Sequence, residues 1–146
     1  MQIKIDEEGF DKLINKLNNL SDAAFKECAR PALNDTATKL KGDMKSYAPV
    51  STTRPIHGVD SIGKTGIRMA RSGYYYYVDV GFSSIIGGHG ADYWTAVRGL
   101  WFQEFKTDEP NFGWYSRNVL SKKNKYQDVL EENLIIQIRR HFFDKL

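Results

Sequence analysis

The feature that most constrains the fold of this 146-residue sequence is a run of four consecutive tyrosines that opens the segment 74–82. Aromatic and β-branched residues are typical of strands, so this segment is predicted to form one. Successive side chains of a strand face opposite sides, which places Tyr74 and Tyr76 on one side. Tyr75 and Tyr77 face the other side. Because both faces are aromatic, the strand is predicted to pack on both sides, between helices or against another chain.

Several elements are predicted before this strand. Alternating apolar residues indicate a short strand over residues 2–6, and apolar residues at helical spacing predict an amphipathic helix over 10–20. Ser21 has the character of an N-cap, so a second helix is expected from there to about Tyr47. Within it, Pro31 either kinks the helix or begins a new one. The inner stripe of this helix is predicted to contain Phe25, Cys28, Ala32, Leu33, Thr36, Leu40, Met44 and Tyr47.

The remaining segments have less regular patterns. Residues 49–60 and the glycine-rich 83–92 are predicted to be loops. Residues 62–70 alternate loosely and end at a turn signal, so they are expected to form a hairpin with the tyrosine strand. Residues 93–105 fit either a strand or a helix. From about Ser121 a long C-terminal helix is predicted, and its apolar residues cover more than one face, as in a buried helix or one that packs on another subunit.

This order of elements separates helices from strands and therefore predicts an α+β fold. A length of 146 residues predicts a single domain over 1–146. The longest unbroken apolar stretches are only a few residues, so a membrane span is not expected. The acidic start of the chain is unlike that of a secretory signal peptide.

Charge is distributed unevenly along the chain. The 21 Lys and Arg residues against 18 Asp and Glu residues leave a formal charge of only +3. Residues 1–11 hold one Lys and four acids, a net charge of −3, whereas residues 39–72 hold seven basic residues and two acids, a net charge of +5. The asymmetry suits the alignment of subunits or partners. The alternative interpretation is a small nucleic-acid-binding module that uses the basic 39–72 region.

No catalytic constellation is found in the sequence. His57, His89 and His141 each stand alone, and no metal-ligand spacing is present, so the chain is predicted to be no enzyme and to bind neither cofactor nor metal. A hydrolase that uses His57 or His89 is a third hypothesis. The single cysteine, Cys28, lies among apolar residues at helical spacing and is interpreted as a buried structural thiol.

The densest aromatic segment is 98–107, in which Trp101, Phe102 and Phe105 surround Glu104. These aromatic residues suit either the core of the domain or the core of an interface, and the sequence leaves both interpretations open. A carboxylate among aromatic side chains is costly to bury alone. Glu104 is therefore expected to meet a cation or to cap a backbone amine.

Three motifs in this order resemble the minor tail component, or tail-completion (neck), family of long-tailed bacteriophages and prophages, a broad group that includes the lambda minor tail protein Z. The first is the opening strand and the helices ending at 47–52, and the second is the strand at 77–81. The third is 100–107, similar to the family's aromatic-Glu-Phe-Gly-Thr signature and followed by the aromatic segment 110–114. Lys106 stands where the family usually has glycine.

The resemblance implies a structural virion protein without catalysis, which forms a homo-oligomeric ring that completes the tail and joins it to the head. Six subunits would match the tail symmetry. The expected partners are other copies of the chain and neighbouring tail-tube, tail-terminator or head-connector proteins, with no specific nucleic acid and no membrane. The residues predicted to serve assembly are Tyr74, Tyr76, Val78, Val80, Trp101, Phe102, Glu104, Phe105 and Phe112.

Overall fold

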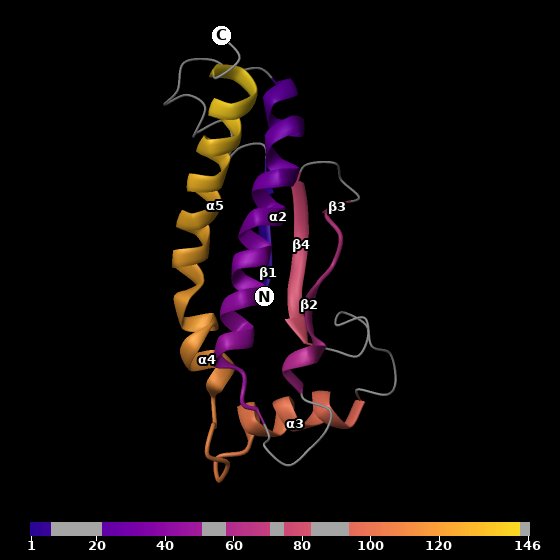
Figure 1. Ribbon diagram of the computed structural model, residues 1–146, viewed down its shortest axis with the longest axis vertical. Helices are drawn as coiled ribbons and strands as arrows, with labels where there is room; N and C mark the ends of the chain where they lie inside the picture. Colours follow the sequence, from indigo (N-terminus) through magenta and orange to yellow (C-terminus); the bar gives the residue numbers. More distant parts are fainter. Residues whose placement is uncertain (7–21, 51–57, 71–74, 83–93, 144–146) are drawn as a thin grey trace. The chain divides into compact units, whose positions relative to one another are not determined.

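Figure 1 shows the computed structural model of the chain, which describes residues 1–6, 22–50, 58–70, 75–82 and 94–143. The fold class is α+β, as predicted, with an antiparallel four-stranded sheet and a long C-terminal helix. In chain order the elements are β1 (Gln2–Asp6), α2 (Asp22–Tyr47), the 3₁₀ helix η1 (Gly58–Ser61), β2 (Ile62–Lys64), β3 (Arg68–Met69), β4 (Tyr75–Phe82), α3 (Trp94–Phe105), α4 (Trp114–Asn118), the 3₁₀ helix η3 (Leu120–Lys122), α5 (Lys123–Ile138) and the π-helical turn η4 (Arg139–Phe143).

The chain divides into two compact units. The first unit comprises Met1, Thr38–Thr65 and Val80–Lys123, and the second comprises Gln2–Ala37, Gly66–Asp79 and Asn124–Leu146. Helix α2 and strand β4 each contribute residues to both units. The single domain expected over 1–146 stays a prediction.

In the second unit, β4 is the central strand. It pairs antiparallel with β1, so that Val78 lies opposite Ile3 and Tyr76 opposite Ile5, and all four side chains are buried. On the other edge β3 pairs with β4 through Tyr76 and Tyr77. The expected alternation is therefore confirmed for residues 75–78, while Tyr74 lies outside the described residues.

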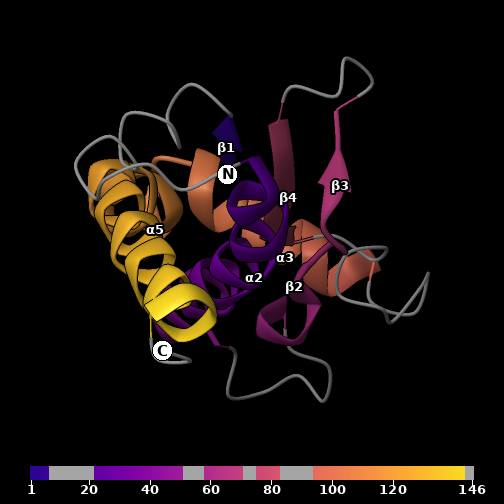
Figure 2. The same ribbon diagram turned by 90° about the horizontal axis from the view of Figure 1, so that it is seen from above.

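Two helices complete the second unit. Figures 1 and 2 show α5 running alongside the first half of α2. The Asn133 Nδ2 of α5 donates to the Thr36 Oγ1 of α2 at 3.0 Å, and the Thr36 hydroxyl donates to the Ala32 carbonyl at 2.8 Å. The buried apolar side chains of the two helices include Cys28, Ala32, Leu33, Tyr126, Leu130, Leu134 and Ile138. The predicted C-terminal helix is thus confirmed, and so is the inner stripe predicted for the preceding helix at Cys28, Ala32, Leu33 and Thr36.

Helix α2 continues through Pro31, so no second helix begins there. The predicted helix over 10–20, the Ser21 cap and the Phe25 side chain lie outside the described residues. The prediction that Tyr47 belongs to the buried stripe of this helix is wrong, because its side chain is 39% exposed. It is the last residue of α2, and there its ring lies 4.7 Å from the Lys122 ammonium, which also donates to its hydroxyl at 2.9 Å.

In the first unit, the end of β4 pairs with β2, and Ile62 lies opposite Phe82. The Met1 backbone exchanges two hydrogen bonds with Val80, of 2.9 and 3.2 Å. The ambiguous segment 93–105 proves to be helical as α3, and residues 107–113 form turns before α4. The buried apolar side chains of this unit include Leu40, Met44, Ile62, Val80, Val97, Leu100, Trp114 and Val119.

Of the predicted loops, 51–57 and 83–92 lie outside the described residues, and Gly58–Ser61 forms η1. No helix in the described part of the chain is long and apolar enough to cross a membrane.

Candidate assembly surface on helix α3

Helix α3 has apolar residues on two faces. Val97, Leu100 and Glu104 recur at helical spacing and are buried in the first unit. The other face exposes Trp101 and Phe102, by 47% and 45%, and Phe105 by 63%. Large aromatic side chains rarely stay this exposed without a function, so the outer face is a candidate contact surface.

A row of aromatic rings connects this face to the core. Trp101 stacks on Phe105, with ring centroids 5.1 Å apart and 13° between the ring planes. On its inner side Trp101 contacts Phe82, 5.2 Å away, and Phe82 in turn contacts the buried Trp114 at 5.5 Å. The indole of Trp114 donates to the Leu100 carbonyl at 3.1 Å. Trp101 is therefore supported by the half-buried Phe82 and, through it, by the buried Trp114.

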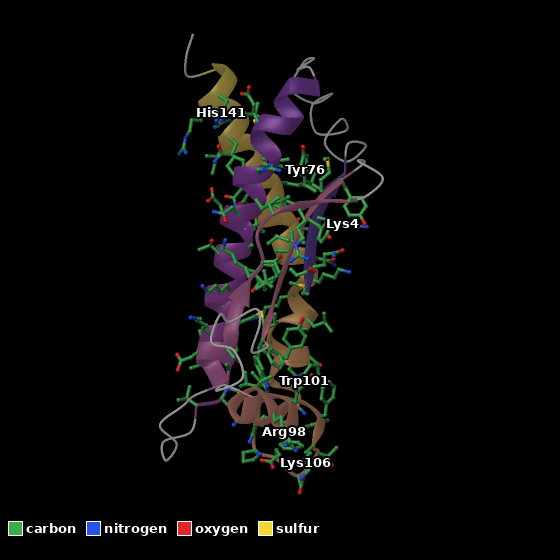
Figure 3. The ribbon with its side chains drawn as sticks, turned by 90° about the vertical axis from the view of Figure 1, so that its right-hand side faces the viewer. Lys4, Tyr76, Arg98, Trp101, Lys106 and His141 are labelled. Carbon is green, nitrogen blue, oxygen red and sulfur yellow. The ribbon has the colours of Figure 1, made fainter. Side chains whose placement is uncertain are left out.

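Two cations accompany the exposed rings. The Arg98 guanidinium lies 5.7 Å from the centre of the Phe102 ring, and the Lys106 ammonium lies 5.4 Å from it. Figure 3 shows both residues close together at α3. Among the residues that the structure describes, neither cation forms an ion pair with a carboxylate. We call Arg98, Trp101, Phe102, Phe105 and Lys106 the α3 face; it is aromatic and positively charged.

Glu104 fixes the chain that follows α3. Its buried carboxylate accepts hydrogen bonds from the backbone amide of Tyr115 at 2.8 Å, from that of Ser116 at 3.2 Å, and from the Ser116 hydroxyl. The Glu104 carbonyl also accepts from the Gly113 amide at 3.0 Å. The expectation that Glu104 would cap a backbone amine is therefore confirmed, at the start of α4. Burial, and secondarily the Glu104 charge, raise the pKa of the Tyr115 phenol.

Two further contacts stabilise the turn between α3 and α4. The Gln103 amide nitrogen donates to the Glu109 carboxylate at 2.9 Å, and its oxygen accepts from the Asn111 amide at 3.2 Å. Phe112 is half-buried, and the Arg117 guanidinium lies 5.4 Å from its ring centre.

The predicted assembly residues thus fall into different environments. Exposed or half-buried side chains belong to Trp101, Phe102, Phe105 and Phe112, and buried ones to Tyr76, Val78, Val80 and Glu104. The buried residues support the chain's own core or backbone, and the assembly role of the whole set stays a prediction. Arg98 and Lys106 were not predicted as part of the site. The sequence does contain a signal for them. Counted from Arg98, the three aromatic residues and Lys106 follow at i+3, i+4, i+7 and i+8, which places all five on one side of a helix.

The described residues include one histidine, His141, and the cysteine Cys28. The described part of the chain holds no group of three or more His, Cys, Asp and Glu side chains that could bind a metal. His57 and His89 lie outside the described residues, and the Nδ1 of His141 is 2.8 Å from the Gln137 carbonyl oxygen. Cys28 is buried as predicted, and burial, with the charge of Glu27, raises the pKa of its thiol to about 11.

The basic 39–72 region is divided between the two units. Lys39 pairs with Asp43 at 3.5 Å, and Lys64 is half-buried in β2, both in the first unit. Arg68 is exposed on β3 in the second unit. Arg54 and Arg71 lie outside the described residues, so the nucleic-acid interpretation stays untested.

A family model described as "Bacteriophage HK97-gp10, putative tail-component" matches residues 11–97, more than half of the chain. No curated protein and no solved structure matches the sequence.

Proposed function

The chain belongs to the bacteriophage HK97-gp10-like family of tail components, and from this premise we propose that it is a tail-completion subunit that works as a homo-oligomeric ring. The family supplies the coarser part of this conclusion, which is a structural role in a phage tail and hence a place in the virion. The ring, the joining of tail to head and a closer kinship with the lambda minor tail protein Z group are the finer parts, and they are proposals.

The observation that carries the proposal is the exposed α3 face. Protein interfaces are enriched in tryptophan, phenylalanine and arginine, and the residues that contribute most binding energy cluster around such rings. Here three aromatic side chains and Arg98 lie on one short helix, and Lys106 follows its last residue. Phe82 contacts Trp101 from behind and itself contacts the buried Trp114. A surface of this composition suits a permanent contact with protein.

A contact through the α3 face can build a ring if the surface that it binds on the neighbouring subunit is a different one. A head-to-tail interface repeats from subunit to subunit and closes when its rotation divides a full turn. Six copies would match the symmetry expected of a tail, and the neighbours in the particle would be tail-tube, tail-terminator or head-connector proteins.

Deletion of the gene from the phage or prophage that encodes it, followed by complementation, tests the proposal. Negative-stain electron microscopy of the lysate without the gene is expected to show filled heads beside unjoined or malformed tails. Normal infectious particles would overturn the tail-completion role.

The complementing variants test the α3 face separately. Because Phe102 and Phe105 are exposed, the double variant F102S/F105S is expected to fold yet fail to restore infectious particles. The matched control is V50S/L120S, which removes two exposed apolar side chains of the same unit that are not part of α3 and is expected to restore infectious particles. Full complementation by F102S/F105S would exclude the α3 face from assembly.

A further inference from the structure

Helix α5 has an exposed face with the same spacing as the α3 face. Asp128, Glu131 and Glu132 are exposed, Ile136 is exposed by 49%, and Ile135 is half-buried. These residues occupy positions i, i+3, i+4, i+7 and i+8, so they lie on one side of the helix. The opposite side is the buried stripe that includes Tyr126, Leu130, Leu134 and Ile138. We call the exposed set the α5 face.

The two faces differ in chemistry in a complementary way. The α3 face carries two cations around aromatic rings, and the α5 face carries three carboxylates followed by two isoleucines. Lys125 and Arg139 are exposed on the same side of this helical segment, before Asp128 and after Ile135, so a cation lies at each end of the α5 face. Among the described residues neither Arg98 nor Lys106 pairs with a carboxylate, and both cations lie beside the exposed Phe102 ring.

We propose that the α3 face of one copy docks on the α5 face of a second copy. This inference rests on the proposed function, because it names the two surfaces that would join neighbouring subunits. The carboxylates of α5 pair with Arg98 and Lys106, and the rings of α3 cover Ile135 and Ile136. Pairing removes the charge that each face carries alone, while the apolar residues lose contact with water.

Contacts between like faces are disfavoured by the same charges. Two α3 faces packed on each other bring Arg98 and Lys106 of one copy against the same cations of the other. Two α5 faces aligned at their centres bring carboxylates together, and such like-charge juxtaposition lowers affinity strongly. The proposed contact therefore joins two unlike surfaces. Each subunit has one of each, so it can contact one neighbour through α3 and another through α5.

Charge reversal tests this contact in the purified full-length chain. One variant, R98E/K106E, makes the α3 face acidic, and a second, E131K/E132K, makes the α5 face basic. The matched controls reverse exposed charges elsewhere, with K45E/K123E for the first variant and D35K/D60K for the second. Circular dichroism verifies that all four variants fold, and sedimentation velocity over a wide concentration range measures self-association.

The wild type and both controls are expected to associate, and more weakly at high salt because the contact is ionic. Each reversed variant alone is expected to bind itself at least about tenfold more weakly. An equimolar mixture of R98E/K106E and E131K/E132K is expected to recover association, because the unchanged α3 face of E131K/E132K meets the unchanged α5 face of R98E/K106E and the two reversed faces complement each other.

Several results would overturn the proposed contact. They are a wild type that stays monomeric at every concentration, reversed variants that associate like the wild type, and a mixture that fails to recover association. If only R98E/K106E loses association, then α3 contacts a different surface. Any of these results leaves the deletion experiment unaffected, so failure of this contact is distinguishable from failure of the tail-completion role.

Discussion

Glu104 is a buried carboxylate that has its hydrogen-bond donors in the chain segment that follows α3. The amides of Tyr115 and Ser116 and the Ser116 hydroxyl all donate to it. A buried charge without such donors would be strongly destabilising. Although Glu104 lies between exposed aromatic residues in sequence, its function is therefore to connect α3 to α4, which positions the α3 face from inside.

The variant Glu104→Gln tests this function. The glutamine amide keeps one acceptor oxygen but has no charge. Its NH₂ group would face the backbone N–H groups of Tyr115 and Ser116, which are also donors. The free energy of unfolding is expected to fall by about 2 kcal/mol. Urea denaturation followed by circular dichroism measures it. Glu27→Gln makes the same chemical change at an exposed position of α2 and is expected to change the value by less than about 0.5 kcal/mol. Equal effects of the two variants would contradict the capping function.

Among the elements, the short helix α4 depends on one backbone conformation at its start. Gly113 precedes α4 with a φ of 72°, in the left-handed region, and a Cβ there would lie 3.2 Å from the Arg117 Nε. Gly99, in contrast, lies within α3, and a Cβ there would meet nothing within 4 Å. The two glycines therefore respond to the same substitution in opposite ways.

Gly113→Ala is expected to lower the free energy of unfolding by about 1–2 kcal/mol, because an L-residue is strained in the left-handed region. Gly99→Ala is expected to raise it by up to about 1 kcal/mol, because alanine is the better helix former. Thermal and urea unfolding of both variants measure the two effects. A stabilising Gly113→Ala variant would show that the turn before α4 can adopt another conformation.

Elements with one clear period could be predicted from the sequence. The alternation at 2–6 and the helical stripe of α2 each have one buried face, so the pattern and the structure agree. The tyrosine strand was expected to pack on both sides, but only the side of Tyr76 is buried, and Tyr75 and Tyr77 on the other side are half-buried. Helix α3 could not be assigned, because it has one apolar stripe that is buried and a second that is exposed. Periodicity detects both stripes but does not distinguish an inner one from an outer one. For this helix, the sequence predicted only that Glu104 needs a cation or a backbone N–H group as a partner.

At the scale of the whole molecule, the two units share continuous elements. Helix α2 and strand β4 each pass from one unit into the other without interruption. Unfolding half of such a helix or strand removes neighbouring hydrogen bonds from the other half, because helix formation is cooperative. We therefore expect the two units to unfold together, as one domain over residues 1–146.

Each unit contains its own reporter of unfolding. All three tryptophans, Trp94, Trp101 and Trp114, belong to the first unit, and the single cysteine, Cys28, belongs to the second. The Cys28 thiol is buried and its pKa is raised to about 11, so it reacts slowly until its unit unfolds. Tryptophan emission and pulsed thiol labelling across a urea gradient are expected to give the same midpoint. Two separate midpoints would mean two domains, and a Cys28→Ala variant verifies that the label reports on this thiol.

The two cations above Phe102 also affect the chain before it reaches a particle. A newly made subunit exposes a tryptophan and two phenylalanines on one helix. Such a hydrophobic patch promotes non-specific association. Arg98 and Lys106 keep hydrated charge beside the central ring, so water remains on this patch. We expect these charges to slow non-specific association until the proposed acidic partner surface replaces the water. On the proposed contact, the same two side chains would therefore keep the free subunit soluble and bind its neighbour in the assembly.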